Sequence, residues 1–125
     1  ESDLFLLKNN KLIATLDIED ELKPNTFDIL DLLNNKGYSL YLLSGDKKSK
    51  CEILKKSINF TDVFSEQLPK DKIDKITELS LKNPTAMIGD GINDAPSLAK
   101  ANIGISLANA TEVAIQSSDV ILLNT

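Results

Sequence analysis

Two aspartates, Asp90 and Asp94, stand four residues apart in the stretch MIGDGINDAP (87–96), directly after an apolar run. The glycines on either side of Asp90 let the backbone approach a ligand closely. Two carboxylates held near each other repel unless a cation joins them, and oxygen ligands that leave room for water suit Mg²⁺. We therefore expect Asp90 and Asp94 to bind Mg²⁺. The alternative is a strand-to-helix turn capped by Asp94 or Asn93, but a cap accounts for only one of the aspartates.

Two further polar clusters adjoin apolar runs. In Ser44-Gly45-Asp46, a hydroxyl and backbone N–H groups at the start of a helix can form an anion site. The alternative is a helix whose N-cap is Asp46. Lys70 and Lys72, in the stretch PKDK, stand near another helix start. A lysine at such a position is most often simply solvated.

Composition narrows the chemistry that these clusters can perform. The chain has 125 residues, enough for one domain, and its 42% hydrophobic and 26% charged residues are ordinary for a soluble globular protein. A net charge of −5 argues against a nucleic-acid binder. Histidine and arginine are absent, so an anion must be met by lysines, backbone N–H groups or a hard metal ion. The single cysteine, Cys51, excludes an internal disulfide and is interpreted as a structural or surface thiol.

The sequence shows no membrane or export signal. No apolar run reaches the ~18 residues that a membrane span needs, so we expect this chain to be soluble and to make no direct membrane contact. It starts at Glu1 without a signal-peptide pattern. A start without methionine suggests a trimmed product or an excised fragment.

The clusters must be positioned by alternating strands and helices. Residues 4–18 are expected to form two strands around an Asn9-Asn10 turn, and Pro24 is expected in the first turn of a helix that ends at Gly37. Further strands are expected over 38–43, near 63–64, and over 86–88, 103–107 and 119–123, with helices over 47–57, 70–82, 94–101 and 111–118. This alternation predicts an α/β fold with a mostly parallel sheet, helices on both faces and an N-terminal β-hairpin. Ligands of such sheets bind beyond the carboxyl ends of the strands.

Taken together, the three clusters resemble the haloacid dehalogenase superfamily, and specifically the phosphorylation domain of P-type ATPases. Residues 89–96, GDGINDAP, are close to a signature of that group. Ser44-Gly45-Asp46 resembles its Thr-Gly-Asp motif, with serine in place of threonine, and Lys72 matches the lysine of its Pro-x-x-Lys motif. Residues 20–24 resemble its hinge stretch, and residues 103–123 its closing segment, with the heavy-metal-transporting branch the most similar. The resemblance implies a haloacid-dehalogenase-like Rossmannoid fold and one domain, 1–125, the C-terminal portion of a phosphorylation domain.

The resemblance also implies roles for individual residues. Ser44 would hold a phosphoryl oxygen and Lys72 would neutralise phosphoryl charge. Asp90 would coordinate Mg²⁺, and Asp94 would bind the metal either directly or through one of its ligands. Asn93 would tie the metal loop to the Ser44 loop. Phosphoryl transfer is mostly positioning and neutralisation of oxygen charge, which agrees with these roles. The residues expected to bind the phosphoryl group or its loop are Ser44, Gly45, Asp46 and Asn93.

One departure from the family is decisive. The nucleophile of the family is the aspartate of Asp-Lys-Thr-Gly-Thr, and that motif is nowhere in the sequence. Asp17 also follows an apolar strand, but it lacks the Gly-Thr and falls at the hinge. The nucleophile strand is central in the family's sheet, so its removal exposes backbone donors and acceptors on two neighbours. Either these neighbours close up, or another chain fills the place, or the strand lies outside this sequence.

The favoured interpretation is a part of the phosphorylation domain of a heavy-metal, copper-type P-type ATPase that is inactive alone. Its cofactors would be Mg²⁺ and, through absent domains of the parent, ATP. Its partners would be the parent's nucleotide-binding domain, actuator domain and membrane helices, at the cytoplasmic face of a membrane. Two alternatives stay open: a free-standing binding or regulatory protein without a nucleophile, and a small Mg²⁺-dependent phosphatase that uses Asp17.

Overall fold

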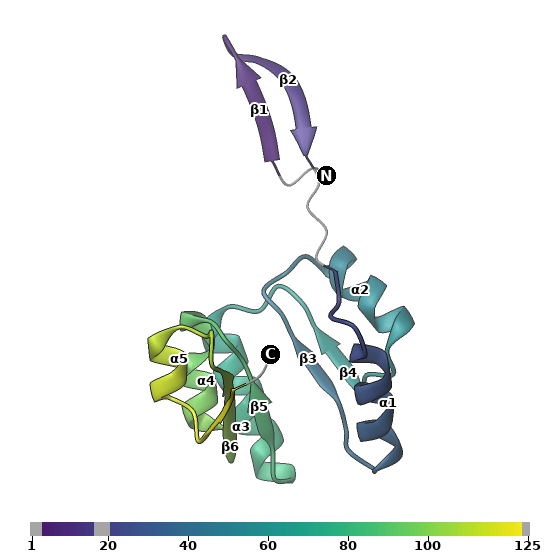
Figure 1. Ribbon diagram of the computed structural model, residues 1–125, viewed down its shortest axis with the longest axis vertical. Coiled ribbons are helices and arrows are strands. Elements are labelled where there is room, and N and C mark those ends of the chain that lie inside the picture. The colour runs from purple at the N-terminus through teal and green to yellow at the C-terminus, as the bar shows by residue number, and fades with distance from the viewer. Residues whose placement is uncertain (1–3, 17–20, 124–125) are drawn as a thin grey trace.

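The computed structural model describes residues 4–16 and 21–123. Strands and helices alternate after an initial pair of strands, as expected for an α/β chain (Figure 1). The elements of the described chain are β1 (Leu4–Lys8), β2 (Lys11–Leu16), α1 (Thr26–Asn35), β3 (Tyr41–Leu43), α2 (Lys48–Ser57), β4 (Asp62–Phe64), α3 (Pro69–Lys82), β5 (Ala86–Ile88), the 3₁₀ turn η1 (Ile92–Asp94), α4 (Ala95–Lys100), β6 (Ile103–Leu107), α5 (Glu112–Gln116) and β7 (Val120–Leu122).

The N-terminal hairpin is confirmed. Strands β1 and β2 pair antiparallel, with Lys8 opposite Lys11. Asn9 and Asn10 form the turn with φ of 50° and 60°. Asparagine tolerates these left-handed values, which a two-residue hairpin turn requires.

The remaining strands are parallel but fall into two sheets. One sheet has the order β5-β6-β7, and the other pairs β3 with β4. Met87 lies opposite Gly104 in the first, and Leu42 opposite Val63 in the second. Helices α4 and α5 pack against β6, and α2 packs against β4. The expected parallel strands with covering helices are confirmed, whereas the single continuous sheet is interrupted.

The hydrophobic core lies between the β5-β6-β7 sheet and its helices. Ile76 of α3, Met87 of β5, Leu98 of α4 and Ala114 of α5 form one buried cluster. Gly104 lets α4 approach β6 closely, since a Cβ there would lie 2.5 Å from the carbonyl oxygen of Leu98. This core fixes β5, and with it the turn that carries Asp90 and Asp94.

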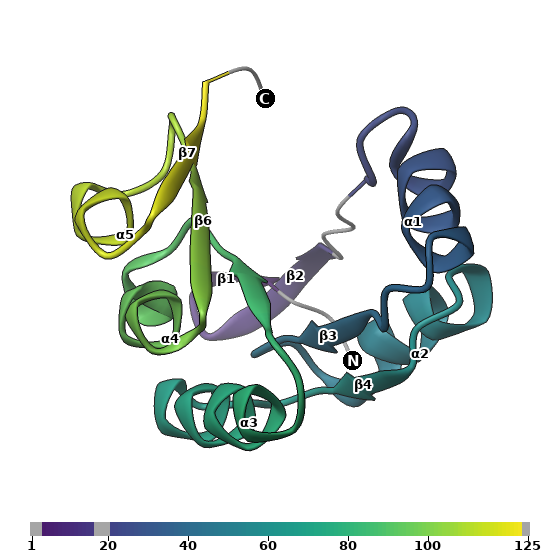
Figure 2. The same ribbon diagram turned by 90° about the horizontal axis from the view of Figure 1, so that it is seen from below.

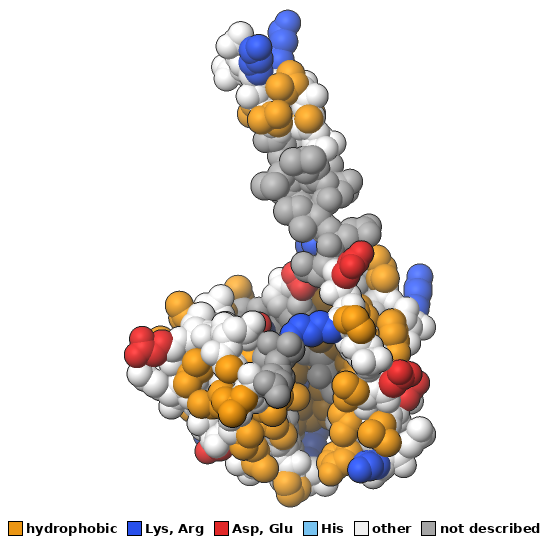
Figure 3. Space-filling view, viewed as in Figure 1, with side chains coloured by type: hydrophobic (Ala, Val, Ile, Leu, Met, Phe, Trp, Pro, Cys, Tyr) orange, Lys and Arg blue, Asp and Glu red, His pale blue; other side chains and the backbone are white. Residues whose placement is uncertain are grey.

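A cleft separates the two parallel sheets. In the described chain β3 pairs only with β4, and β5 only with β6, so the facing edges of β3 and β5 are unpaired (Figure 2). The cleft has a volume of about 850 Å³ and is lined by α1, β3, α3, β5 and β6, through side chains that include Leu33, Leu42, Leu79 and Ile105. Ile88 on β5 is 64% exposed, and apolar side chains border the hollow in Figure 3. The two neighbours have therefore not closed up.

Three expectations need correction. Pro24 precedes the first helix, which begins at Thr26 after the left-handed Asn25. The strand expected over 38–43 is confined to Tyr41–Leu43, because β4 supplies only three residues to pair with it. The helix expected over 94–101 begins one residue later, because Asp94 ends the 3₁₀ turn η1 and α4 runs from Ala95 to Lys100. Within the described residues, no helix combines the length and apolar character needed to cross a membrane.

Candidate phosphoryl and metal site

The Ser44-Gly45-Asp46 turn directly follows β3. The Ser44 N–H donates to the carbonyl of Phe64 at 2.9 Å, which extends the β3-β4 pairing by one residue. The Ser44 Oγ donates to the Asp46 carboxylate at 2.8 Å and accepts from the Asp46 N–H at 3.1 Å. Helix α2 has Lys47 at its N-cap, so the alternative of an Asp46 cap is wrong. The Asp46 carboxylate instead holds the serine hydroxyl.

The segment between β4 and α3 is tied to the same turn. The Gln67 N–H donates to the Ser44 carbonyl and the Glu66 N–H to the Asp46 carbonyl, both at 2.9 Å. Helix α3 then begins, with the Leu68 N–H donating to the Asp71 carboxylate at 2.9 Å. A first-turn acid that accepts from the N-cap N–H stabilises a helix start. These bonds fix where α3 begins relative to the Ser44 turn, and thereby where Lys72 lies.

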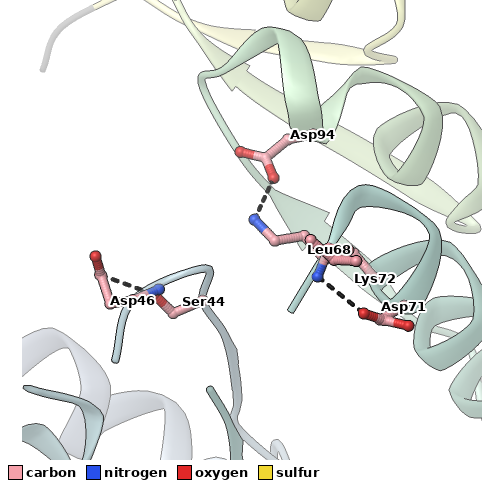
Figure 4. A network of polar contacts seen from close by, with 6 residues as sticks. All are labelled: Ser44, Asp46, Leu68, Asp71, Lys72 and Asp94. Atoms are coloured by element: carbon pink, nitrogen blue, oxygen red, sulfur yellow. Dashed lines mark hydrogen bonds and ion pairs between the residues drawn. The ribbon is translucent and has the colours of Figure 1, made fainter. Parts of the chain in front are cut away.

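Lys72 contacts Asp94 across the site. The Lys72 Nζ lies 2.7 Å from Asp94 Oδ1, and the two side chains are only 13% and 16% exposed. Figure 4 shows the pair on one side of an opening, with the Ser44 and Asp46 side chains on the other. The ion pair joins the first turn of α3 to the end of the β5–α4 turn. Its partial burial makes it stronger than an exposed surface pair.

The β5–α4 turn is shaped around the Asp94 side chain. A Cβ on Gly89 would lie 2.9 Å from Asp94 Cβ and 3.2 Å from its Cγ and Oδ2. Glycine is therefore required for this position of the carboxylate. Asp94 stands at the N-cap of α4 but makes no capping hydrogen bond with its side chain. The capping alternative is thus wrong for Asp94, whose carboxylate is directed to Lys72.

Asp90 and Asn93 behave differently from Asp94. The Asp90 carbonyl accepts from the Thr111 N–H at 3.1 Å, which anchors the turn to the start of α5. Both side chains are exposed. Among the described residues, neither side chain takes part in a recorded hydrogen bond or ion pair. The expected tie between Asn93 and the Ser44 loop is therefore not made in this structure.

A family model described as a haloacid dehalogenase-like hydrolase matches residues 2–102. The chain belongs to the haloacid dehalogenase-like hydrolases. It is 33% identical over 120 residues, 96% of this chain, to the copper-exporting P-type ATPase B of Archaeoglobus fulgidus, of which it spans 17%.

Two solved structures are also similar. The catalytic domain of the CPx-ATPase CopB-B matches with a TM-score of 0.82 and 36% identity, over 98% of this chain and 49% of that chain. A Moraxella catarrhalis 3-deoxy-D-manno-octulosonate 8-phosphate phosphatase, in complex with magnesium and phosphate ions, matches with a TM-score of 0.65 and 26% identity, over 74% of this chain and 55% of that chain. The resemblance to heavy-metal P-type ATPases that the motifs suggested is confirmed.

In this haloacid dehalogenase-like chain, the β5–α4 turn carries the two carboxylates that could hold a hard cation. Lys72 engages Asp94 Oδ1, whereas Oδ2 lies over the two glycines, 3.2 Å and 3.6 Å from where Cβ atoms of Gly89 and Gly91 would sit. Asp90, four residues earlier in the chain, is exposed to solvent. No group of three or more acids, histidines or cysteines within the described residues could hold a metal. Asp90 and Asp94 are therefore the residues of this turn that could hold Mg²⁺, which commonly keeps several waters and needs few protein ligands.

The sequence pattern alone did not reveal how the candidate site residues pair. It singled out Lys72 and Asp94 separately, without the ion pair between them. It also missed Glu66 and Gln67, whose N–H groups bind the Ser44 turn. The left-handed φ of 56° at Glu66 has no signal in the residue type. The alternative nucleophile, Asp17, lies outside the described residues.

Proposed function

We propose that this chain is the C-terminal part of the phosphorylation domain of a copper-type P-type ATPase, where it binds Mg²⁺ and the phosphoryl group during ATP-driven cation transport. The observation that carries the proposal is the Lys72–Asp94 contact opposite the Ser44 turn, which gathers the three family motifs at one opening. Similarity to the Archaeoglobus ATPase over 96% of this chain supports it. The parent's nucleotide-binding domain, actuator domain and membrane helices would complete the transporter on the cytoplasmic side.

In this proposal the residues differ in role according to the charge of their side chains. The Ser44 hydroxyl and the backbone of the Ser44 turn donate to phosphoryl oxygens. The Lys72 ammonium group neutralises their charge. Asp90 and Asp94 hold Mg²⁺, which supplies further neutralisation of the phosphoryl oxygens. Such positioned charges account for most of the catalysis of phosphoryl transfer.

The cleft between β3 and β5 would receive the strand that carries the nucleophile. Each facing edge belongs to a three-residue strand that has no strand partner on the cleft side within the described chain, and an inserted parallel strand would satisfy both edges at once. The cleft walls are largely apolar, with Leu42 and Ile88 among the lining side chains. A strand buried between them needs apolar residues on both faces. At the carboxyl end of that strand, an aspartate would lie between Ser44 and Asp90.

A Mg²⁺ titration tests the metal site. Amide NMR shifts in the ¹⁵N-labelled chain should centre on residues 89–94. Asp90→Asn should weaken the response strongly, whereas Asp31→Asn, which removes the same charge from an exposed position on α1, should titrate like the parent chain. If Asp90→Asn also titrates like the parent, the metal assignment is wrong.

A peptide titration tests the strand cleft. The probe is a soluble peptide with five apolar β-branched residues followed by Asp-Lys-Thr-Gly-Thr, and its control has the same residues in scrambled order. Binding should protect the amides of Tyr41–Leu43 and Ala86–Ile88 from hydrogen exchange. Equal protection by both peptides, or protection confined to other elements, would contradict the proposed place of the strand.

A further inference from the structure

Lys72 and Asp94 form an ion pair that the proposed roles do not require. Lys72 is assigned to the phosphoryl group and Asp94 to the metal ion, yet here the two bind each other at 2.7 Å. For Asp94, the Lys72 ammonium takes the place expected for the metal cation. For Lys72, the Asp94 carboxylate takes the place expected for the phosphoryl anion. Building on the proposed function, we propose that Lys72 is an internal counter-ion that competes with Mg²⁺ for Asp94 until an anion draws it away.

The burial of the pair explains why a counter-ion is needed. The Asp94 side chain is 16% exposed, and a carboxylate removed from water to this extent is unfavourable unless it is paired. In the described chain Lys72 is the only cation that binds it. The ammonium therefore stabilises the empty site. It also places a positive charge beside the oxygen that a metal ion would approach, where like charges repel.

The geometry decides which partner moves. Asp94 is held by its own N–H, which donates to the Gly91 carbonyl at 3.1 Å, and by close packing of its Cβ against Gly89. The Lys72 ammonium sits on a flexible four-carbon stem, which can reorient at small cost. An anion bound at the Ser44 turn would attract this ammonium across the opening seen in Figure 4. Lys72 would then leave Oδ1 available to the metal.

Competition of this kind links the two ligands thermodynamically. An anion that draws Lys72 from Asp94 raises the affinity for Mg²⁺, and Mg²⁺ raises the affinity for the anion by the same factor. Coupling between ligand sites is typically about 5- to 150-fold. Because the pair is partly exposed, we expect a factor near the lower end. The chain would therefore bind metal weakly when it holds no phosphoryl group.

The experiment measures Mg²⁺ affinity by amide NMR shifts of residues 89–94 in the full chain, so its readout is independent of activity. Lys72→Gln removes the counter-ion, and Lys72→Met repeats the test with an apolar stem in case the first variant folds poorly. Lys70→Gln is the matched control, because it removes the same charge from an exposed position on the same helical turn. Each protein is titrated with and without inorganic phosphate, at equal free Mg²⁺ and equal ionic strength.

We expect Lys72→Gln and Lys72→Met to bind Mg²⁺ about 5-fold more tightly than the parent, and Lys70→Gln to differ by less than about 2-fold. Phosphate should tighten Mg²⁺ binding to the parent chain and to Lys70→Gln by a larger factor than to the Lys72 variants. Equal or weaker Mg²⁺ binding by both Lys72 variants would overturn the competition while leaving the metal site in place. Shifts that do not centre on residues 89–94 in any of these proteins would overturn the proposed metal site itself.

Discussion

Substitution of Gly89 by alanine is a direct test of how the site is built. The added Cβ would lie 2.9 Å from Asp94 Cβ and 3.2 Å from Asp94 Cγ and Oδ2. The first distance is shorter than real Cβ contacts allow, so Asp94 or the turn must shift. A shift of Asp94 would disturb the contact of its carboxylate with Lys72, whose Nζ is 2.7 Å from Oδ1.

The expected magnitude follows from comparison with Gly91. A Cβ on Gly91 would have ordinary contacts, 3.6 Å from Asp94 Oδ2 and 3.9 Å from the Asn93 nitrogen. Forcing a methyl group into a packed place costs about 1–3 kcal/mol. Replacing glycine by alanine also restricts the unfolded chain, and this favours folding by about 0.4–1 kcal/mol at both positions. Because that gain is the same for both variants, it cancels in the comparison. The free energy of unfolding of Gly89→Ala should therefore be about 1–3 kcal/mol lower than that of Gly91→Ala.

Urea unfolding of the two variants measures this difference. An Asp94→Gly background tests the cause, because it removes the three atoms nearest to the new methyl group, Asp94 Cβ, Cγ and Oδ2. Gly89→Ala should cost markedly less there, with a coupling well above the 0.3–0.5 kcal/mol that independent sites show. Equal stabilities of Gly89→Ala and Gly91→Ala, or additive effects with Asp94→Gly, would refute the packing of Asp94 against Gly89.

Three further predictions concern the core and the ionisable groups, and one concerns chemistry. Gly104→Ala should destabilise the chain by about 1–3 kcal/mol, because its Cβ would lie 2.5 Å from the Leu98 carbonyl oxygen, whereas Gly45→Ala, with its nearest contact at 3.6 Å, should be near neutral in the same urea assay. Hydrogen bonds from Lys75 and Lys82 lower the pKa of Glu78 to about 2. The stabilisation from this interaction is therefore present above the usual pKa of 4.5 and is lost as the pH falls toward 2. A carboxyl NMR titration should show the lowered pKa, and high salt should raise it, because Glu78 is exposed. Burial raises the pKa of the Cys51 thiol, so alkylation at pH 8 should be slow in the folded chain and fast in urea; equal rates would contradict its burial. Incubation with γ-labelled ATP and Mg²⁺ should leave no acid-stable label on the chain, whereas label that disappears in Asp17→Asn would favour the small-phosphatase alternative.

Much of the fold could be predicted because its signals are local. The two asparagines of the hairpin turn, the apolar runs of β5 and β6, and Gly37 with a φ of 87° after α1 each reveal an element through a residue type or a period. The length of β3 could not be predicted in this way. It depends on how many residues β4 offers for pairing, which is a tertiary property.

The site shows the same division between local and tertiary information. The residue types at Ser44, Lys72, Asp90 and Asp94 identify candidates, since phosphoryl and metal chemistry needs hydroxyl, ammonium and carboxylate groups. Their pairing in the structure is decided by competition among charges in space. Asp46 and Asp94 both had a local alternative as helix caps, and neither side chain caps a helix. A hydroxyl or an ammonium brought close by the tertiary fold was the better partner for each carboxylate.

The open cleft follows from how the two sheets are anchored. Strand β5 is fixed from one face by the core that Ile76, Met87 and Leu98 form, whereas β3 is fixed by pairing with β4 and by the bonds of the Ser44 turn. Neither anchor involves the other sheet, so neither brings the facing edges of β3 and β5 into pairing. Closure would have to remove the space around Ile88 and Ile105 that α1 and α3 border. The facing edges of β3 and β5 therefore stay apart, with the Ser44 turn directly following one strand and the Gly89 turn directly following the other.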